Sequence, residues 1–410
     1  MPQAFLIPVR ASVATTQSLT ALFLPILLAG RFFSENMTGV SSLMEGVMSQ
    51  SVIFFTGFPG FIGKRLVSKI LESNASARFR FLVQSSMLSI AQESIAGFKK
   101  KFPQAEFSIM TGSIDRADLG LGKEALKNLV EEVTDVFHLA AIYDLSVPRE
   151  IAYKVNVDGT THILDFCEKI KALNKLVYFS TCYVAGKRTG RILEDDLEKG
   201  QQFKNYYEET KYLAEVEVRK RMKNIPAIVI RPSIVVGDSE TGETQKFDGP
   251  YFMMRFIDMF YYGVNIPYIG DSSAYFNIVP VDYIINGSIA LWKKQDNAGK
   301  TYQLADPHPV RARELFALLS EHLTGETPGW ALPHWLIEGA LSIPMVGPAL
   351  GIPVQSLLYL KHPVEYDCRN AVADLEESGV SCPSVKDYIG NLVSFFKEHK
   401  EEEKYRVKVH

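Results

Sequence analysis

The sequence predicts an α/β fold with a doubly wound parallel sheet, and two observations support this prediction. First, the apolar run 51–55 is rich in β-branched and aromatic side chains, and a glycine-containing turn and a helical pattern follow it directly. Second, strand-like and helical patterns alternate along the chain beyond this unit. Such alternation is typical of parallel strands joined by right-handed helical crossovers.

The turn after the first strand has the spacing of a phosphate-binding loop. Gly57, Gly60 and Gly63 stand three residues apart, and a helical pattern follows over 64–71. In such a turn the glycines allow a tight bend, a close approach of the backbone to a pyrophosphate, and close packing of helix on strand. Three glycines also occur in ordinary turns, but the strand before them and the helix after them favour a dinucleotide site. Its expected contacts are Gly57, Phe58, Pro59, Gly60, Phe61, Ile62 and Gly63.

The remaining elements of the predicted sheet follow in the same alternation. Strands are expected at 79–83, 106–110, 135–141, 175–180 and 227–231, and helices at about 149–167 and 206–221. In such sheets ligands bind outside the carboxyl ends of the strands. Functional residues are therefore expected directly after each strand.

The residue after the second strand bears on the choice of cofactor. An acidic residue there would bind the ribose of NAD, and a basic residue would accept the 2′-phosphate of NADP. This chain has Gln84 at that place. Because no acid there opposes a 2′-phosphate, and Lys64 or Arg65 could supply positive charge, we expect NADP rather than NAD.

The third and fourth strands also end in residues expected near the cofactor. Ser113 and Ile114 belong to a loop expected on the adenine side. Ala140 and Ala141 are small, so they let the backbone approach the cofactor after the fourth strand. His138 precedes them, and for this single histidine we expect packing or a local hydrogen bond rather than catalysis.

A serine–threonine pair and a tyrosine–lysine pair form the predicted catalytic site. Ser180 and Thr181 follow the fifth strand, and Tyr207 and Lys211 lie four apart on one face of the predicted helix 206–221. A nearby ammonium favours the phenolate, so Lys211 is expected to lower the pKa of Tyr207 and let it exchange a proton with a substrate oxygen. A hydroxyl at Thr181 would polarise the same oxygen. The alternative is a solvated helix face, because this spacing is also common by chance.

Six motifs together resemble one family. They are Thr56-Gly57-x-x-Gly60-x-x-Gly63, His138-x-Ala140-Ala141, Asn156-Val157-x-Gly159-Thr160, Ser180-Thr181, Tyr207-x-x-x-Lys211 and Arg231-Pro232-Ser233. In this order they are similar to the extended short-chain dehydrogenase/reductase family, and the likeness covers about 51–325. Within it, the runs 179–186 and 203–211 most resemble the thioester-reductase or male-sterility branch. Members of that branch have a Rossmann-type fold and reduce acyl thioesters, including fatty acyl ones, with NADPH.

The resemblance implies roles for particular residues. Thr181, Tyr207 and Lys211 would be the catalytic trio. The implied cofactor contacts beyond the glycine turn and the strand-end residues are Asn156, Ser180, Tyr207, Lys211, Pro232, Ser233 and Ile234. Two positions depart from the pattern of that branch: Gln84 stands where arginine is frequent, and Ser113 replaces the aspartate that is usual near the adenine.

Composition excludes several other classes of protein. The 410 residues are 47% hydrophobic and 22% charged, with a net charge of −3 and no long basic run, so nucleic acid is not an expected partner. The four cysteines form no close pair and are expected as reduced thiols in the cytoplasm. The apolar segment 21–29 is too short to span a bilayer, and no transmembrane segment or metal site is predicted.

We expect three regions along the chain. Residues 1–47 are interpreted as a disordered or non-essential extension, because Met48 could start a chain just before the first strand. Residues 48–325 form the expected NAD(P)-binding domain, with a substrate-lobe insertion at about 238–275. Residues 326–410 form the expected substrate or cap region, with a helix over 384–399 and a frayed end over 400–404.

The insertion and the region after it bear on the substrate. Residues 249–262 are rich in methionine and aromatic side chains, which suit a pliable acyl pocket and equally suit core packing. The apolar stretch 330–360 is interrupted by prolines and is expected to cap the pocket.

The sequence therefore predicts an NAD(P)H-dependent reductase acting on a carbonyl or acyl thioester of a lipophilic substrate, with a homodimer as its expected assembly. The alternatives are a hydroxysteroid-type dehydrogenase or a nucleotide-sugar epimerase on the same fold, and a non-catalytic nucleotide-binding protein. The aromatic insertion argues against a sugar pocket, and the intact trio argues against a non-catalytic role.

Overall fold

The computed structural model describes residues 51–143, 147–260, 266–269, 274–333, 335, 336, 339 and 359–406. The predicted extension 1–47 and most of the apolar stretch predicted to cap the pocket lie outside the described residues.

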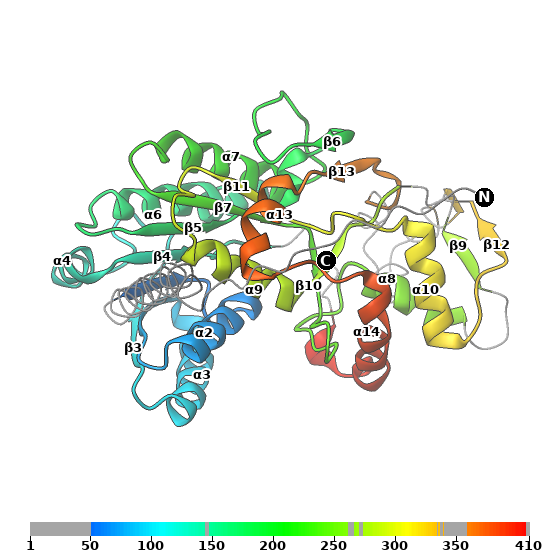
Figure 1. The fold of residues 1–410 in the computed structure, drawn as a ribbon, viewed down its shortest axis with the longest axis horizontal. Coiled ribbons are helices and arrows are strands. Elements are labelled where there is room, and N and C mark those ends of the chain that lie inside the picture. Colours follow the sequence, from blue (N-terminus) through cyan, green and yellow to red (C-terminus); the bar gives the residue numbers. More distant parts are fainter. Residues whose placement is uncertain are drawn as a thin grey trace, which may run out of the picture. The chain divides into compact units, whose positions relative to one another are not determined.

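In the described part of the chain, seven strands form one parallel sheet in the order β11, β7, β5, β4, β1, β2, β3 (Figure 1). Their bounds are β1 (Val52–Thr56), β2 (Arg78–Val83), β3 (Glu106–Thr111), β4 (Asp135–His138), β5 (Lys175–Phe179), β7 (Ala227–Pro232) and β11 (Thr301–Leu304). The strand order proceeds from β1 in two opposite directions, to β2 and to β4. A crevice for a ligand is expected at this switch point, outside the carboxyl ends of the strands.

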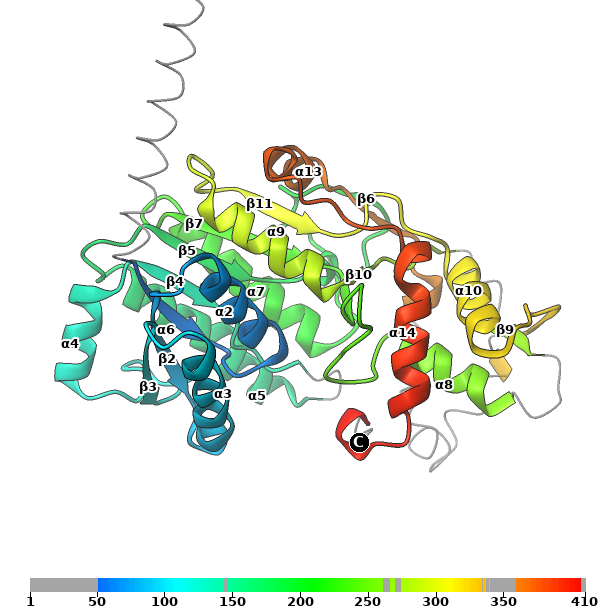
Figure 2. The ribbon, with the colours of Figure 1, turned by 60° about the horizontal axis from the view of Figure 1, so that its bottom comes forward.

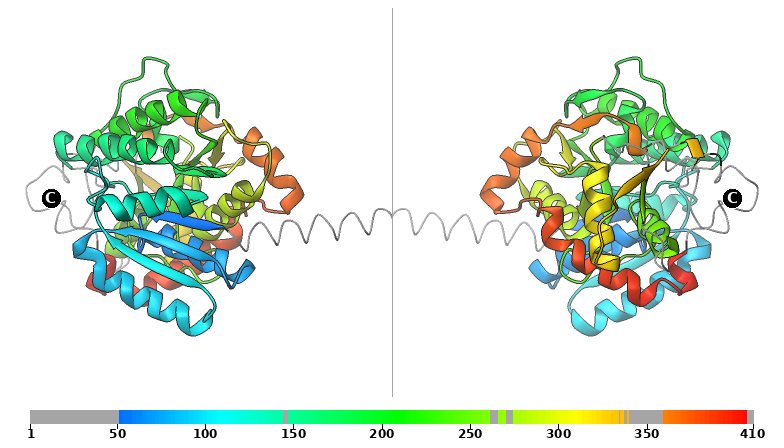
Figure 3. Two further views of the ribbon diagram at one scale, coloured as in Figure 1. Left: turned by 90° about the vertical axis from the view of Figure 1, so that its left-hand side faces the viewer. Right: turned by 90° about the vertical axis from the view of Figure 1, so that its right-hand side faces the viewer.

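Helices cover both faces of the sheet (Figures 2 and 3). One face carries α4 (Lys123–Glu132), α6 (Gly159–Cys167) and α7 (Tyr206–Arg221), which share a hydrophobic core with the strands. The other face carries α2 (Phe61–Ser73), α3 (Leu88–Lys101) and α9 (Val281–Lys293), with α13 (Arg369–Leu375) packed against β11 and α9.

Burial on both faces explains why the first strand is an uninterrupted apolar run. Phe54 packs on Phe166 of α6, with ring centroids 5.0 Å apart, whereas Phe55 points to the opposite face and stacks on Phe137 at 4.7 Å. A strand covered by helices on both sides loses the alternation of apolar and polar residues.

A second hydrophobic core lies beside the sheet. It is built by α8 (Tyr251–Phe260), α10 (Ala312–Thr324) and α14 (Val385–His399), at the right of Figure 1. The short parallel strand pairs around these helices and the sheet are β6 (Gly190–Ile192) with β13 (Val364–Tyr366), β8 (Ile234–Val236) with β10 (Ile278–Pro280), and β9 (Pro267–Ile269) with β12 (Trp330–Leu332). Met253, Met254 and Phe256 of α8 are buried in this core. Of the two interpretations of this segment, core packing therefore holds for these side chains.

Most predicted elements agree with the structure, and two differ from it. The helices predicted at 206–221 and 384–399 are confirmed as α7 and α14. The strand predicted at 135–141 ends at His138, and a π-helical turn at Lys154–Asp158 separates α5 (Arg149–Tyr153) from α6 in the predicted helix 149–167.

The end over 400–404 was predicted to be frayed and solvated; Glu401, Glu403 and Lys404 are exposed, but the prediction of fraying is wrong. Lys400 forms an ion pair of 2.7 Å with Asp258 of α8, and Tyr405 is buried in the second core. The charged run 400–404 has no apolar pattern from which packing could be predicted. The buried ring of Tyr405, just beyond this run, anchors the segment. Among the described residues, no helix combines the length and apolar character needed to cross a membrane.

Candidate active site

The glycine turn joins β1 to α2 with no space for a side chain at its three glycines. Gly57 has a φ of +86°, and the N–H of Gly60 donates a hydrogen bond of 2.9 Å to its carbonyl oxygen. A Cβ at Gly57 would lie 2.9 Å from the backbone nitrogen of Ala140, and a Cβ at Gly60 or Gly63 would lie 2.7 or 2.9 Å from the carbonyl oxygen of Gly57. Each of the three predicted glycines is therefore required by a close backbone contact.

The loop after β4 is bound to the end of β1 by buried side chains. The Oγ1 of Thr56 accepts a hydrogen bond from the N–H of Ala140 (3.2 Å) and contacts Nδ1 of His138 (2.7 Å). Nε2 of His138 contacts Oγ1 of Thr160 at 3.1 Å. Burial, with the charge of Lys211 adding to it, lowers the pKa of His138 to about 3. The imidazole is therefore neutral, and the prediction of a local hydrogen-bonding role is confirmed.

Gln84 and Ser113, the two positions that depart from the family pattern, contact each other. Nε2 of Gln84, after β2, donates a long hydrogen bond of 3.4 Å to Oγ of Ser113, after β3. Hydrogen bonds from Ser113 and Lys154 hold the pKa of Asp115 below its ordinary value. Ile114, which lies between Ser113 and Asp115 in the chain, is buried. The predicted adenine side thus carries an exposed amide and a hydroxyl, without a carboxylate on β2.

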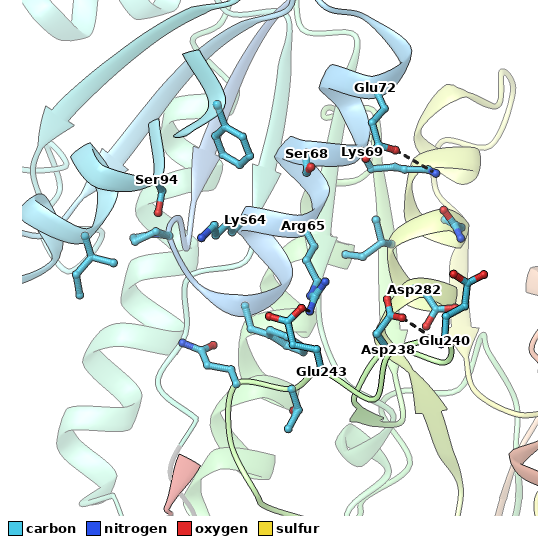
Figure 4. Close-up of a pocket in the computed structure, with 18 of the residues that line it drawn as sticks. Lys64, Arg65, Ser68, Lys69, Glu72, Ser94, Asp238, Glu240, Glu243 and Asp282 are labelled. Atoms are coloured by element: carbon cyan, nitrogen blue, oxygen red, sulfur yellow. Dashed lines mark hydrogen bonds and ion pairs between the residues drawn. The ribbon is translucent and has the colours of Figure 1, made fainter. Parts of the chain in front are cut away.

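Lys64 and Arg65, the cations considered for a 2′-phosphate, point into a cavity of about 880 Å³ beside α2 (Figure 4). Arg65 forms an ion pair of 3.0 Å with Glu243, and its guanidinium lies 4.8 Å from the ring centroid of Phe61. The predicted catalytic residues do not line this cavity. The charge of Arg65 is therefore directed toward Glu243.

Asn156 connects the loop after β4 with α7. Its Oδ1 accepts a hydrogen bond from the N–H of Ile142 (2.8 Å), and its Nδ2 donates to Oγ1 of Thr210 (3.0 Å). It lies in the π-helical turn, and its side chain is fully buried. In this structure its amide therefore supports the helix that carries the tyrosine–lysine pair.

Thr181 and Tyr207 meet at the carboxyl ends of the strands. Thr181 precedes a 3₁₀ turn at Cys182–Ala185, and its Oγ1 accepts a hydrogen bond from the N–H of Tyr183 (3.2 Å). Tyr207 is half-buried in the first turn of α7, with its ring 5.0 Å from that of Tyr143 in an edge contact. Burial raises the pKa of Tyr207 above its ordinary value, and a hydrogen bond with Thr181 lowers it in part.

Lys211 lies buried one turn after Tyr207. Its Nζ donates a hydrogen bond of 2.7 Å to the carbonyl oxygen of Phe179 and lies 4.6 Å from the ring centroid of Tyr178. Burial lowers the pKa of Lys211 to about 7. The prediction that Lys211 lowers the pKa of Tyr207 is wrong for this structure, because the ammonium binds a backbone carbonyl and desolvation dominates both groups.

The residues after β7 complete the site. Pro232 ends the strand, Ile234 begins β8, and the Oγ of Ser233 is buried without a hydrogen-bond partner among the described residues. An unpaired buried hydroxyl and a turn with glycine at its three closest backbone contacts both fit a nicotinamide dinucleotide, which would supply donors, acceptors and phosphates there. The predicted site residues thus lie along the carboxyl edge of one sheet.

One residue that the sequence interpretation missed lies below this site. Glu215 follows Lys211 by four positions on α7 and accepts a hydrogen bond of 2.6 Å from Oγ of Ser180. The side chain of Ser180 therefore faces the protein interior. The i, i+4 spacing from Lys211 could have indicated that Glu215 shares its helix face.

The parallel sheet and the glycine turn define a protein of the Rossmann-type, NAD(P)-binding class. The family model described as male sterility protein matches residues 55–288, more than half of the chain, and the chain belongs to this family.

Relatives of two kinds are similar to this chain. A putative fatty acyl-CoA reductase of Drosophila melanogaster is 25% identical over 279 residues, which cover 58% of this chain and 51% of that protein. A non-canonical nonribosomal peptide synthetase of Aspergillus campestris is 26% identical over 308 residues, covering 69% of this chain and 29% of the synthetase. The chain thus spans about half the length of the first relative and less of the second.

Solved structures agree with this class. The terminal R domain from the myxalamid PKS-NRPS biosynthetic pathway superposes with a TM-score of 0.72 and 25% sequence identity, covering 87% of this chain and 92% of that domain. A UDP-glucuronic acid 4-epimerase from Bacillus cereus in complex with NAD gives a TM-score of 0.59 at 20% identity. This second likeness concerns the fold alone.

Proposed function

We propose that this protein reduces the carbonyl carbon of an acyl thioester, using a reduced nicotinamide cofactor. The observation that carries the proposal is the hydrogen bond between Thr181 and Tyr207 at the carboxyl edge of the sheet, with Lys211 one turn further along the same helix. Tyr207 also contacts the loop after β4, which contacts the glycine turn. The fatty acyl-CoA reductase and the R domain among its relatives support a thioester rather than a sugar or a steroid.

In the proposed reaction, the cofactor would supply a hydride to the thioester carbon. The hydroxyls of Thr181 and Tyr207 hold the carbonyl oxygen by hydrogen bonds, and Tyr207 donates its proton to the oxyanion that develops there. The carbon–sulfur bond of the resulting hemithioacetal then breaks, its hydroxyl group loses a proton and the sulfur gains one, so that an aldehyde and a thiol leave. Lys211 donates its hydrogen bond to the carbonyl oxygen of Phe179, and so it holds the segment that carries Thr181.

The acyl chain of the proposed substrate is argued from the relatives and from the second core. The described methionine and aromatic residues of α8 pack against α10 and α14 and so shape the lobe that adjoins the site. We propose that residues 48–325 form the NAD(P)-binding domain with an insertion at about 238–275, and that 326–410 contribute to the substrate side. A cytoplasmic location and a homodimer remain predictions.

NADPH is the proposed cofactor. The exposed end of β2 carries Gln84 and no carboxylate, so nothing there repels a 2′-phosphate. Because Arg65 is paired with Glu243, its guanidinium does not support this preference. The proposal therefore rests on the residues after β2 and on the reductases of the same branch.

A cofactor-oxidation assay with the purified chain tests the function. We expect loss of NADPH absorbance with a long-chain acyl-CoA and with the corresponding acyl thioester of pantetheine, and production of free thiol from both. In Tyr207→Phe, turnover should fall about 10²- to 10⁴-fold, because general acid catalysis is lost while the ring remains.

The neighbouring Tyr206→Phe serves as the matched control, because Tyr206 is exposed and one residue away. It should leave turnover unchanged. Full activity in Tyr207→Phe would contradict the catalytic assignment. Epimerisation of a nucleotide-sugar without thioester reduction would contradict the proposed substrate class.

A further inference from the structure

A fully buried carboxylate lies directly behind the proposed catalytic trio. Glu215 has no exposed surface, and four donors surround it. They are Oγ of Ser180 at 2.6 Å, Nη2 and Nε of Arg231 at 2.6 and 3.0 Å, and Nε of Arg219 at 2.9 Å. A buried carboxylate with this many donors is stable in its charged form, because each hydrogen bond compensates for lost hydration.

These contacts bind the segment after β5 to helix α7 at two points. Glu215 holds the side chain of Ser180, and Lys211, one turn earlier on the same helix, holds the carbonyl oxygen of Phe179. Thr181 follows immediately in the chain. The distance of Thr181 from Tyr207, which is on the same helix, is therefore set by the side chains of Glu215 and Lys211.

The same carboxylate acts on Lys211 through its charge. Burial lowers the pKa of Lys211, and Glu215 is the group that opposes this shift. Several titratable or charged groups surround Lys211 and Glu215. They are His138 of β4, Tyr178 of β5, Cys182 after β5, Tyr207 and Arg219 of α7, and Arg231 of β7. His138 is neutral, and the two arginines carry charge of the same sign as Lys211.

We propose that Glu215 is a positioning residue for the reduction. It fixes Thr181 opposite Tyr207 through its hydrogen bond with Ser180. Its negative charge, four residues from Lys211 on the same helix face, also favours the ammonium form of that side chain. This proposal rests on the proposed function of the trio, and it adds a residue that would act without contacting substrate or cofactor.

Two variants separate the positional effect from the electrostatic effect. Glu215→Gln removes the charge, and Ser180→Ala removes one hydrogen bond while the charge stays. We expect kcat to fall about tenfold or more in both, with KM for the cofactor changed less than kcat, because the loss concerns the geometry of the reacting groups.

The pH profile of kcat distinguishes the two variants. As pH rises, Lys211 should lose its proton before Tyr207, whose pKa is raised. Removal of a negative charge disfavours the ammonium further, so the basic limb of the profile should move to lower pH in Glu215→Gln and stay in place in Ser180→Ala. Glu217→Gln, in an exposed ion pair with Lys220 on the same helix, is the control and should leave kcat and its pH profile unchanged.

Three results would overturn the proposal. They are a folded Glu215→Gln with the wild-type pH profile, a Ser180→Ala with wild-type kcat, and equal shifts of the basic limb in both variants. Glu215→Gln removes the charge that pairs with Arg219 and Arg231. If this loss prevents the variant from folding, Ser180→Ala still tests the positional claim alone.

Hydrogen–deuterium exchange of residues 179–186 gives a readout that needs no activity. We expect faster exchange in Ser180→Ala than in wild type, because the segment loses an anchor to α7; unchanged exchange would contradict the positioning role. If the wild-type chain reduces no carbonyl compound, the proposed function fails, whereas the exchange result still decides whether Glu215 and Ser180 hold this segment.

Discussion

At the scale of single residues, Gly57 shows how backbone geometry limits the proposed cofactor site. Its positive φ and its contact with Ala140 leave no room for a Cβ. In Gly57→Ala we expect cofactor affinity to fall at least about tenfold, because a residue in this strained conformation costs about 1–3 kcal/mol and the loop after β4 must move. Fluorescence titration with NADPH measures the effect.

Gly97 provides the matched control for that substitution. It lies exposed within α3, and an added Cβ would meet nothing within 4 Å. Gly97→Ala should leave cofactor affinity unchanged and stabilise the fold by about 0.5–1 kcal/mol, because alanine loses less conformational freedom in a helix. Equal loss of affinity in both variants would mean that the turn does not bind the dinucleotide.

Gln84 offers a test of cofactor choice at the same scale. In Gln84→Arg, the ratio of kcat/KM for NADPH to that for NADH should rise about tenfold or more, because a guanidinium binds the 2′-phosphate by charge-assisted hydrogen bonds. In Gln84→Asp the ratio should fall, because a carboxylate repels the phosphate and binds the ribose hydroxyls. A wild-type preference for NADH, or the same ratio in all three proteins, would contradict the proposal.

At the scale of elements, helix α7 combines several functions in sixteen residues. Asn205 caps its N-terminus by accepting a hydrogen bond from the N–H of Glu208 (2.9 Å), so the helix begins at Tyr206. Tyr207, Lys211 and Glu215 then follow at intervals of four, along one face toward the sheet. Helix α7 therefore carries Tyr207 and Lys211 of the proposed site, and through Lys211 and Glu215 it also holds the segment that leads to Thr181.

The segment after α14 is the element for which the sequence interpretation was wrong, and it can be tested by stability. Tyr405 packs on Phe247 with ring centroids 4.9 Å apart, and its carbonyl oxygen accepts a hydrogen bond from the N–H of Phe247 (2.9 Å). Tyr405→Ala should lower the free energy of unfolding by about 3 kcal/mol, because a buried aromatic ring leaves a cavity.

Chemical denaturation monitored by circular dichroism measures this change. The exposed residue Glu403 provides a control in the same 3₁₀ turn, and Glu403→Ala should change stability by less than about 0.5 kcal/mol. Equal stability of Tyr405→Ala and wild type would show that the segment is not anchored in solution.

At the scale of the whole molecule, a single sheet edge brings together residues far apart in the sequence. The glycine turn, Thr181, Tyr207 and Ser233 all follow strands or begin helices at that edge. Because parallel strands place all their carboxyl ends on one side, the motifs could be assigned to one site before their contacts were known. The second core, in contrast, forms where α8, α10 and α14 pack together. These helices are far apart in the sequence, so no local pattern predicted that they pack on one another.

The sequence by itself determined six of the seven strands of the described sheet, the glycine turn and the register of Tyr207 and Lys211 on one helix face, whereas it did not predict β11. These features depend on residues near each other in the chain, so the local periodicity of the sequence predicts them. Only the tertiary structure decided that Lys211 binds the carbonyl of Phe179, that Arg65 pairs with Glu243, and that Glu215 lies behind the trio. Burial and charge pairing depend on neighbours that the fold brings from distant positions, so no local pattern predicts them.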